Sequence, residues 1–163
     1  MFKRAKTLGL TTSLDPQWDP KEEWQCDWNN LLPLVDVFLP NIEELKNISR
    51  KTSMKEAINA IKNISNTIVV KNGTEGAMIF YKDEIIEQPA FINNDFADAI
   101  GAGDSFNAGF ISQFIQKKSL SECAECGAIC GVINTTQKGG TAAFKDLNTV
   151  KKIALEQFNY SLR

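Results

Sequence analysis

The sequence contains no histidine. This absence excludes Ser-His and Cys-His catalytic pairs, because histidine is the base that activates the nucleophile in them. It also excludes zinc sites with imidazole ligands. Any acid–base chemistry must therefore fall to Asp, Glu, Lys, Tyr or Cys side chains.

Long apolar stretches and basic tracts are also lacking. No apolar run approaches the roughly 20 residues that span a bilayer, so a membrane is not an expected partner. The net charge is −2, which does not favour nucleic acid as a partner. The first residues, Met1–Lys6, are too short and too charged for a signal peptide, so a cytoplasmic protein is expected.

Cysteine is sparse, and the four residues are Cys26, Cys123, Cys126 and Cys130. The last three have the spacing C-x2-C-x3-C, which could indicate a metal or cluster site. However, they also fall at i, i+3 and i+7 of a helical pattern. We therefore favour packing of small apolar thiols in a core. Reduced thiols also fit a cytoplasmic protein.

The chain has 163 residues, of which 43% are hydrophobic, and this fits one globular domain over residues 1–163. Extended patterns alternate with helical ones along the chain. Strands are predicted at 7–14, 35–39, 67–71, 77–81 and 84–88. Helices are predicted after the capping residues Asn41, Ser53, Ser119 and Asn148, and after the glycine pair near position 102. This order predicts an α/β three-layer sandwich with a mostly parallel sheet.

Three tryptophans, Trp18, Trp24 and Trp28, lie among charged residues in segment 17–30. An exposed aromatic cluster could bind a ligand. We favour the alternative that the tryptophans bury their rings and fasten the segment to the domain.

Residues 98–110 carry the most informative pattern, a glycine-containing turn that leads into an apolar helix. Gly101 and Gly103 have no Cβ, so a ligand can approach their N–H groups closely. Such groups at a helix N-terminus form an anion site. Asp104 would repel an anion, which suggests a base that collects a proton from a substrate hydroxyl. The alternative is that Asp104 caps the helix and the glycines only form a tight turn.

Four polar residues follow directly after predicted strands. They are Asp15, Asn41, Lys71 and Asp98. Ligands of parallel α/β sheets bind at the carboxyl ends of strands, so we expect these side chains to meet at one edge. For Asn41 the alternative is a helix cap, and for Lys71 it is a solvated strand end.

The run Gly101-Ala-Gly-Asp104, continued by Ser-Phe-Asn-Ala-Gly-Phe110, resembles the C-terminal signature of the ribokinase-like (PfkB) carbohydrate kinases. The resemblance implies that Asp104 is the catalytic base. It also implies that the amides of Gly101, Ala102 and Gly103 stabilise the transferring phosphoryl group. Asp98 would begin a loop that binds a monovalent cation such as K⁺.

Other segments are similar to the same family. Asn41-Ile-Glu-Glu44 matches its Asn-x-x-Glu motif, which implies that Glu44 holds Mg²⁺ through water and that Asn41 lies near the phosphates of ATP. Lys71 would also lie near the phosphates. Further nucleotide contacts are implied for the glycines of two loops, Gly73, Gly76, Gly139 and Gly140.

The resemblance implies an enzyme that transfers phosphate from ATP to a hydroxyl of a sugar or sugar acid, as fructokinases, ribokinases and 2-keto-3-deoxygluconate kinases do. It covers only the C-terminal portion of the family, without the N-terminal strands and the lid. One alternative is therefore a nucleotide-binding remnant without kinase activity, and another is a vitamin-type kinase for pyridoxal or hydroxymethylpyrimidine. A cut sheet edge also predicts self-association into a homo-oligomer or low stability.

Overall fold

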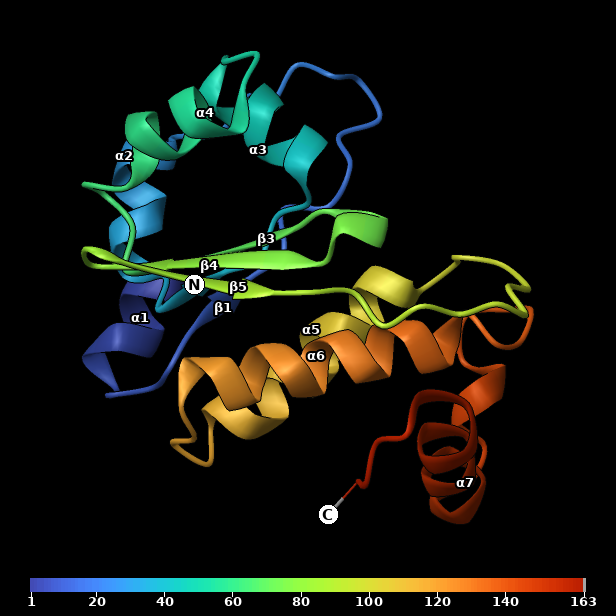
Figure 1. Ribbon diagram of the computed structural model, residues 1–163. Helices are drawn as coiled ribbons and strands as arrows, with labels where there is room; N and C mark the ends of the chain where they lie inside the picture. The colour runs from blue at the N-terminus through green and yellow to red at the C-terminus, as the bar shows by residue number, and fades with distance from the viewer. Residues whose placement is uncertain (163) are drawn as a thin grey trace. The chain divides into compact units, whose positions relative to one another are not determined.

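The computed structural model describes residues 1–162. The chain divides into two compact units, which we describe in turn (Figure 1). The first consists of Met1–Asn72 and Met78–Ile86. The second consists of Gly73–Ala77 and the described residues from Glu87 onward. The expectation of a single domain over residues 1–163 stays a prediction.

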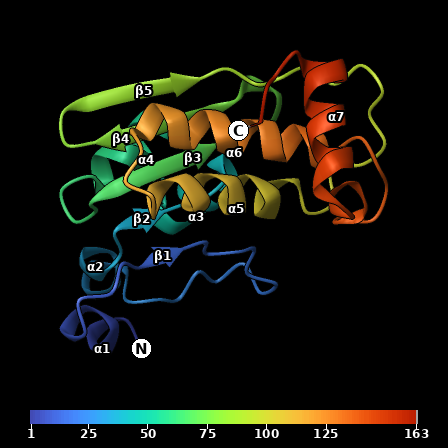
Figure 2. The ribbon, with the colours of Figure 1, turned by 90° about the horizontal axis from the view of Figure 1, so that it is seen from below.

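A five-stranded sheet has the order β1-β2-β3-β4-β5. Its strands are β1 (Ser13–Leu14), β2 (Val37–Phe38), β3 (Thr67–Lys71), β4 (Ala77–Tyr81) and β5 (Glu84–Gln88). The pairs β1–β2 and β2–β3 are parallel. β4 runs in the opposite direction, and β5 runs in the direction of β3 (Figure 2). Connections of a few residues on either side of β4 explain this reversal, since a parallel crossover needs a dozen residues or more.

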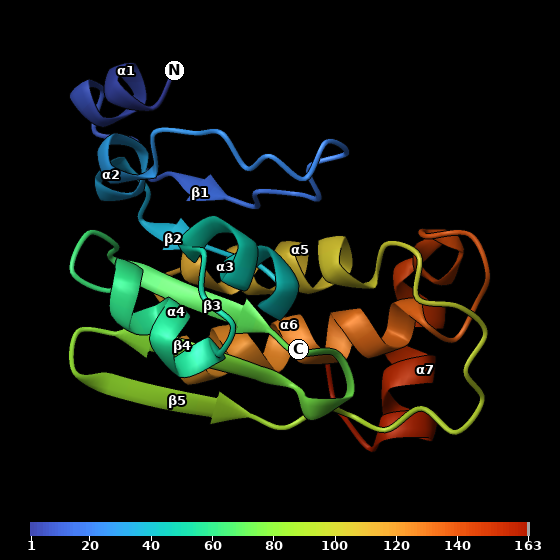
Figure 3. The ribbon, with the colours of Figure 1, turned by 90° about the horizontal axis from the view of Figure 1, so that it is seen from above.

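The core of the first unit lies under two helices, α3 (Ile42–Ser49) and α4 (Met54–Ile61), which lie side by side over one face of the sheet (Figures 1 and 3). The first four residues of β3 are buried, as expected for a β-branched strand inside a sheet. Other buried members of this core include Leu32, Val35, Phe38, Leu45 and Ile58. Short helical segments complete the unit: α1 (Phe2–Thr7), α2 (Trp28–Leu31) and a 3₁₀ turn at Leu32–Leu34.

The second unit is mostly helical. It contains α5 (Ala102–Phe114), α6 (Leu120–Asn134), α7 (Leu147–Phe158) and 3₁₀ turns at Gly73–Glu75 and Ala142–Phe144. α5 and α6 pack along each other (Figure 3). Ser119 and Glu122 form the predicted capping box at the start of α6. No helix within residues 1–162 is both long enough and apolar enough to span a membrane.

The prediction of a strand over 7–14 is wrong for most of its length, because residues up to Thr7 form α1 and only Ser13–Leu14 is extended. Gly9 takes a left-handed conformation, with φ of 71°, which interrupts an extended run. Leu8 and Leu10 are 65% and 55% exposed, so the apolar residues that suggested a buried strand do not enter the core.

Two further predictions need correction. Asp146, and not Asn148, caps α7, because its carboxylate accepts the Thr149 N–H at 2.8 Å. Burial of the tryptophan rings is confirmed for Trp24, whereas Trp18 is 48% exposed. The Trp18 ring instead contacts the ring of Trp24 edge to face, with the centroids 5.3 Å apart.

Candidate active site

Three of the four predicted strand-end residues meet in the first unit. Lys71 Nζ lies 2.8 Å from Asp15 Oδ2. An isolated parallel β-bridge joins the backbones of Asn41 and Lys71. The convergence predicted for these residues is therefore confirmed. The Lys71 side chain is only 13% exposed, so the alternative of a solvated strand end is wrong.

Glu44 belongs to the same group, and we call Asp15, Asn41, Glu44 and Lys71 the strand-end cluster. Asn41 Oδ1 accepts the Glu44 N–H at 2.9 Å, and the Asn41 N–H donates to Glu44 Oε2 at 2.8 Å. This capping box confirms that Asn41 caps α3. It also fixes the Glu44 carboxylate at the end of the sheet. The residue as a whole is 5% exposed.

The electrostatic environment of Glu44 is unusual for a capping residue. Burial raises the pKa of its carboxyl group, and the negative charge of Asp15 raises it further. The Asn41 N–H and the positive charge of Lys71 act in the opposite direction but do not cancel the burial. Glu44 therefore holds its charge at a cost in free energy.

This donor set fits Mg²⁺. Mg²⁺ prefers oxygen ligands and keeps several of its waters, so one or two carboxylates suffice to hold it. Within residues 1–162, no group of three or more His, Cys, Asp or Glu side chains converges on a point. Glu44 would then supply the protein ligand, directly or through water, because Asp15 is paired with Lys71 at 2.8 Å.

The glycine motif forms the N-terminus of α5 in the second unit. Gly101 is the N-cap residue, with φ of 76°, and Ala102 is the first helical residue. No side chain in the described part of the chain caps this end, so the alternative that Asp104 is a cap is wrong. Asp104 is exposed in the first turn. The arrangement places the exposed Gly103 backbone and the exposed Asp104 carboxylate side by side, whereas the Ala102 N–H donates to the Ala99 carbonyl at 3.1 Å.

Asp98 ties the motif to the loop that contains Gly139 and Gly140. Its Oδ1 accepts the Ile100 N–H at 2.9 Å, and its Oδ2 accepts the Gly139 N–H at 3.0 Å. A Cβ on Gly101 would lie 3.0 Å from the Gly140 carbonyl oxygen, so glycine is needed for this close approach. However, Asp98 does not follow a strand as predicted, because β5 ends ten residues earlier at Gln88.

Asn134 completes this contact and was not among the predicted site residues. It is 1% exposed at the end of α6, and its amide donates to Ser105 Oγ at 3.0 Å and to the Gly140 carbonyl. It therefore holds the loop at 139–140 against the first turn of α5. The only signal in the sequence is one polar residue at the end of an apolar helix, followed after Thr135–Lys138 by a glycine pair.

The two glycines predicted in the first nucleotide loop differ in their surroundings. A Cβ on Gly76 would overlap the Gln88 carbonyl oxygen and lie 2.8 Å from Ala90 N. Backbone packing is therefore enough to explain glycine at this position. Gly73 has open space around its Cα, so its backbone remains accessible to a ligand.

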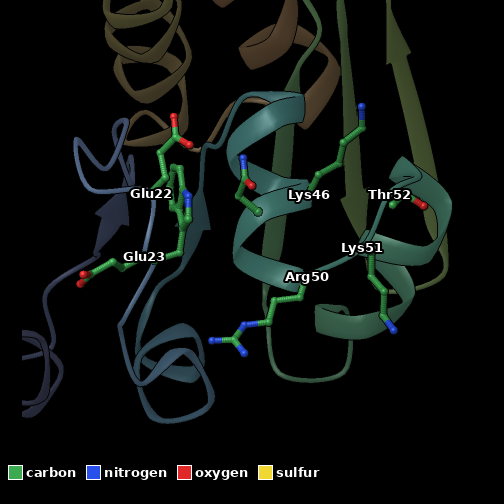
Figure 4. A pocket seen from close by; sticks show the side chains of 8 residues that line it. Glu22, Glu23, Lys46, Arg50, Lys51 and Thr52 are labelled. Carbon is green, nitrogen blue, oxygen red and sulfur yellow. The ribbon is translucent and has the colours of Figure 1, made fainter.

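A pocket of about 370 Å³ opens beside the C-terminal end of α3 and contains none of the predicted site residues. It is lined by Glu22, Glu23, Trp24, Lys46, Asn47, Arg50, Lys51 and Thr52 (Figure 4). The charged side chains of Lys46, Arg50 and Lys51 point in different directions. Since binding sites have polar groups that converge, we assign no function to this pocket.

The sequence matches the pfkB family carbohydrate kinase over residues 1–147. It is 31% identical over 141 residues to a 2-dehydro-3-deoxygluconokinase from Haemophilus influenzae, a match over 82% of this chain and 44% of the relative. It is 27% identical over 157 residues to a nucleoside kinase from Methanothermobacter thermautotrophicus, over 96% of this chain and 50% of the relative.

The structure resembles that of Arabidopsis thaliana ribokinase complexed with ribose and ATP, with a TM-score of 0.80 and 24% identity. The similarity covers 93% of this chain and 50% of the ribokinase, and it confirms the predicted ribokinase-like α/β fold. The chain thus spans about half the length of the relatives it matches. Since the family match extends over most of the sequence, the chain belongs to the pfkB family of carbohydrate kinases.

Proposed function

We propose that this chain carries the ATP-binding and catalytic part of a kinase that phosphorylates a hydroxyl of a sugar or sugar acid. The observation that carries the proposal is the uncapped N-terminus of α5, where glycine-motif amides lie beside the exposed carboxylate of Asp104. The family match and the 2-dehydro-3-deoxygluconokinase relative support this substrate class.

In this proposal Asp104 accepts the proton of the substrate hydroxyl as its oxygen attacks the γ-phosphorus of ATP. The N–H groups of Gly101, Ala102 and Gly103 donate to the phosphoryl oxygens, where negative charge gathers during the transfer. To do so, the Ala102 N–H must exchange its bond to the Ala99 carbonyl, 3.1 Å away, for one to the phosphoryl group. The chemistry then needs only positioning, a base and charge stabilisation, all of which this turn offers.

We assign the strand-end cluster to the binding of the ATP phosphates. Lys71 contributes positive charge, Asn41 lies near the phosphates, and Glu44 holds Mg²⁺ through water. When bound, Mg²⁺ neutralises charge on the phosphates. Because Lys71 is already paired with Asp15, a phosphate must compete with that carboxylate for it.

The glycine loops are assigned to the nucleotide as well, with Gly73 and Gly76 on one loop and Gly139 and Gly140 on the other. Asp98 is assigned to a monovalent cation such as K⁺. Each of its carboxylate oxygens accepts one N–H, which leaves a further lone pair on each for a cation.

Asp104→Asn tests the assignment of the base. Release of ADP is measured over a panel of ribose, fructose and 2-keto-3-deoxygluconate, and binding of ATP·Mg²⁺ is measured by calorimetry. We expect turnover to fall on the order of 10²-fold or more while ATP binding persists. Asp83→Asn, which neutralises an exposed carboxylate in the β4–β5 turn, is the matched control and should leave turnover unchanged. Full turnover by Asp104→Asn would overturn the assignment.

A second candidate function is a nucleotide-binding remnant without kinase activity. The match covers about half of the length of these relatives. Binding of ATP·Mg²⁺ without ADP release on any sugar of the panel would identify this alternative. The vitamin-type kinase is less favoured, because those relatives commonly have Gly-Thr-Gly-Asp where this chain has Ala102.

A further inference from the structure

Asn134, the last residue of α6, lies against both ends of the turn that carries the glycine motif. Its Nδ2 donates to Ser105 Oγ at 3.0 Å and lies 3.4 Å from the position that a Cβ on Gly101 would take. Gly101 and Ser105 are themselves joined, because the Ser105 N–H donates to the Gly101 carbonyl at 2.9 Å. Gly103 and Asp104 lie between these two residues. The Asn134 amide therefore supports the turn that bears the proposed base.

The loop at 139–140 is fastened at both of its glycines. The Gly139 N–H donates to Asp98 Oδ2 at 3.0 Å, and the Gly140 carbonyl accepts from the Asn134 amide nitrogen. The two glycines have positive φ, 94° and 70°, a backbone conformation that other residues rarely adopt. Through one amide group, Asn134 thus bonds both to this loop and to α5.

Packing alone does not explain an amide at this place. Asn134 is 1% exposed, and the two residues before it, Val132 and Ile133, are buried and apolar. The Asn134 Oδ1 atom is also buried, and it accepts no hydrogen bond within the part of the chain that the structure describes. A buried acceptor without a partner costs free energy, and an apolar side chain would avoid that cost. The contribution of Asn134 therefore lies in its N–H donors.

We propose that Asn134 is a positioning residue, which sets the distance between the loop at 139–140 and the turn that carries Asp104. The inference rests on the proposed function, in which the loop contacts the nucleotide and the turn contacts the phosphoryl group. Because one amide joins the two segments, the loop needs no separate ordering when ATP binds, and the phosphoryl end of ATP is directed to the turn. Asn134 acts through Gly140 and Ser105, and not by contact with the reacting atoms.

Three variants separate the donors of Asn134 from its size and place. Asn134→Leu removes the donors and keeps a side chain of similar length, whereas Ser105→Ala removes only the acceptor on α5. Thr136→Val is the matched control, because the Thr136 hydroxyl donates to the Ile133 carbonyl at 2.8 Å, within the end of the same helix. Circular dichroism and urea unfolding establish that each variant is folded.

The first test measures cleavage of the full chain by trypsin after Lys138, the exposed residue directly before Gly139. We expect cleavage there to be on the order of 10-fold faster in Asn134→Leu than in the parent chain, because loss of the bond to Gly140 frees the loop. Thr136→Val should be cut at the parent rate, and cleavage after other lysines is the internal reference. An unchanged rate after Lys138 in Asn134→Leu would overturn the inference.

The second test measures the affinity for ATP·Mg²⁺ by calorimetry, and the KM values for ATP and for the sugar that is phosphorylated. Asn134→Leu should weaken ATP binding and raise the KM for ATP on the order of 10-fold, with the KM for the sugar unchanged. A smaller folded fraction would instead lower kcat and leave both KM values as in the parent. Ser105→Ala should have a smaller effect alone and none in the double variant, since the bond that it removes is already absent there.

The outcomes distinguish this inference from the proposed function. If the parent chain binds ATP but releases no ADP, the kinase assignment fails, and the ATP affinity of Asn134→Leu still decides the role of Asn134. If a folded Asn134→Leu binds ATP as the parent does, the inference fails and the kinase assignment stands. A parent chain that binds no ATP would contradict both.

Discussion

Glu44 has a structural role and a proposed metal-binding role, and burial opposes the charge that the second role requires. As part of the capping box it fixes the start of α3, yet burial disfavours the charge that would hold Mg²⁺. Its folded-state pKa is raised above the unfolded value. The stability that this group contributes is therefore present below the unfolded pKa, about 4.3, and is lost as pH rises through the folded value.

Glu44→Gln should consequently be more stable than the parent chain at pH 7, because glutamine still accepts the Asn41 N–H but carries no charge. The difference should vanish near pH 4, where the glutamate is protonated. Urea unfolding at both pH values measures this. Glu43→Gln, an exposed neighbour on the same helix, is the control and should change stability by less than about 0.5 kcal/mol. A less stable Glu44→Gln at pH 7 would contradict the argument, and weaker binding of ATP·Mg²⁺ by this variant is expected from its proposed role.

The α5–α6 pair shows how a helix contact depends on where each glycine lies. A Cβ on Gly109 would meet the Cys126 carbonyl at 2.5 Å, whereas a Cβ on Gly131 would lie 3.4 Å from the Ala102 carbonyl and 3.6 Å from Phe106 Cβ. The first contact would force the helices apart, whereas the second would be ordinary van der Waals packing.

The same substitution should therefore act in opposite directions at these two positions. Gly109→Ala should destabilise the chain by about 1–3 kcal/mol, the usual cost of overpacking. Gly131→Ala should stabilise it by up to about 1 kcal/mol, since alanine is the better helix former. Urea unfolding of both variants measures the difference. Equal effects would show that the close approach at Gly109 does not constrain the pair.

For the whole molecule, the sheet edge at β1 has the largest consequence. β1 stands at one end of the strand order and pairs with β2 alone in the described part of the chain. Exposed Leu8 and Leu10 precede it. An open strand edge next to apolar side chains favours association with another chain.

We therefore expect the chain to self-associate in analytical ultracentrifugation as its concentration rises. Replacing both Leu8 and Leu10 by lysine should reduce this association. Leu147→Lys, at a position in the second unit with the same exposure as Leu8, should not. A stable monomer at all concentrations would count against this expectation.

Local chemistry was enough to predict much of this protein from its sequence. β3, β4 and β5 have the predicted bounds, because β-branched runs and short polar turns specify them without distant partners. The capping boxes of α3 and α6 and the glycine motif of α5 also rest on residues close together in the chain. The family resemblance was carried by these same short segments.

Other features were decided only by the tertiary structure. Residues 7–12 have the pattern of a buried strand but leave Leu8 and Leu10 exposed, because the alternation of side chains does not reveal whether a partner strand is present. The buried contact of Asn134 with the 139–140 loop and the Asp15–Lys71 ion pair both depend on side chains that folding brings together. Burial and charge at such contacts are properties of three-dimensional packing. For that reason the sequence could indicate which residues bear chemistry, while only the fold determined their protonation and their partners.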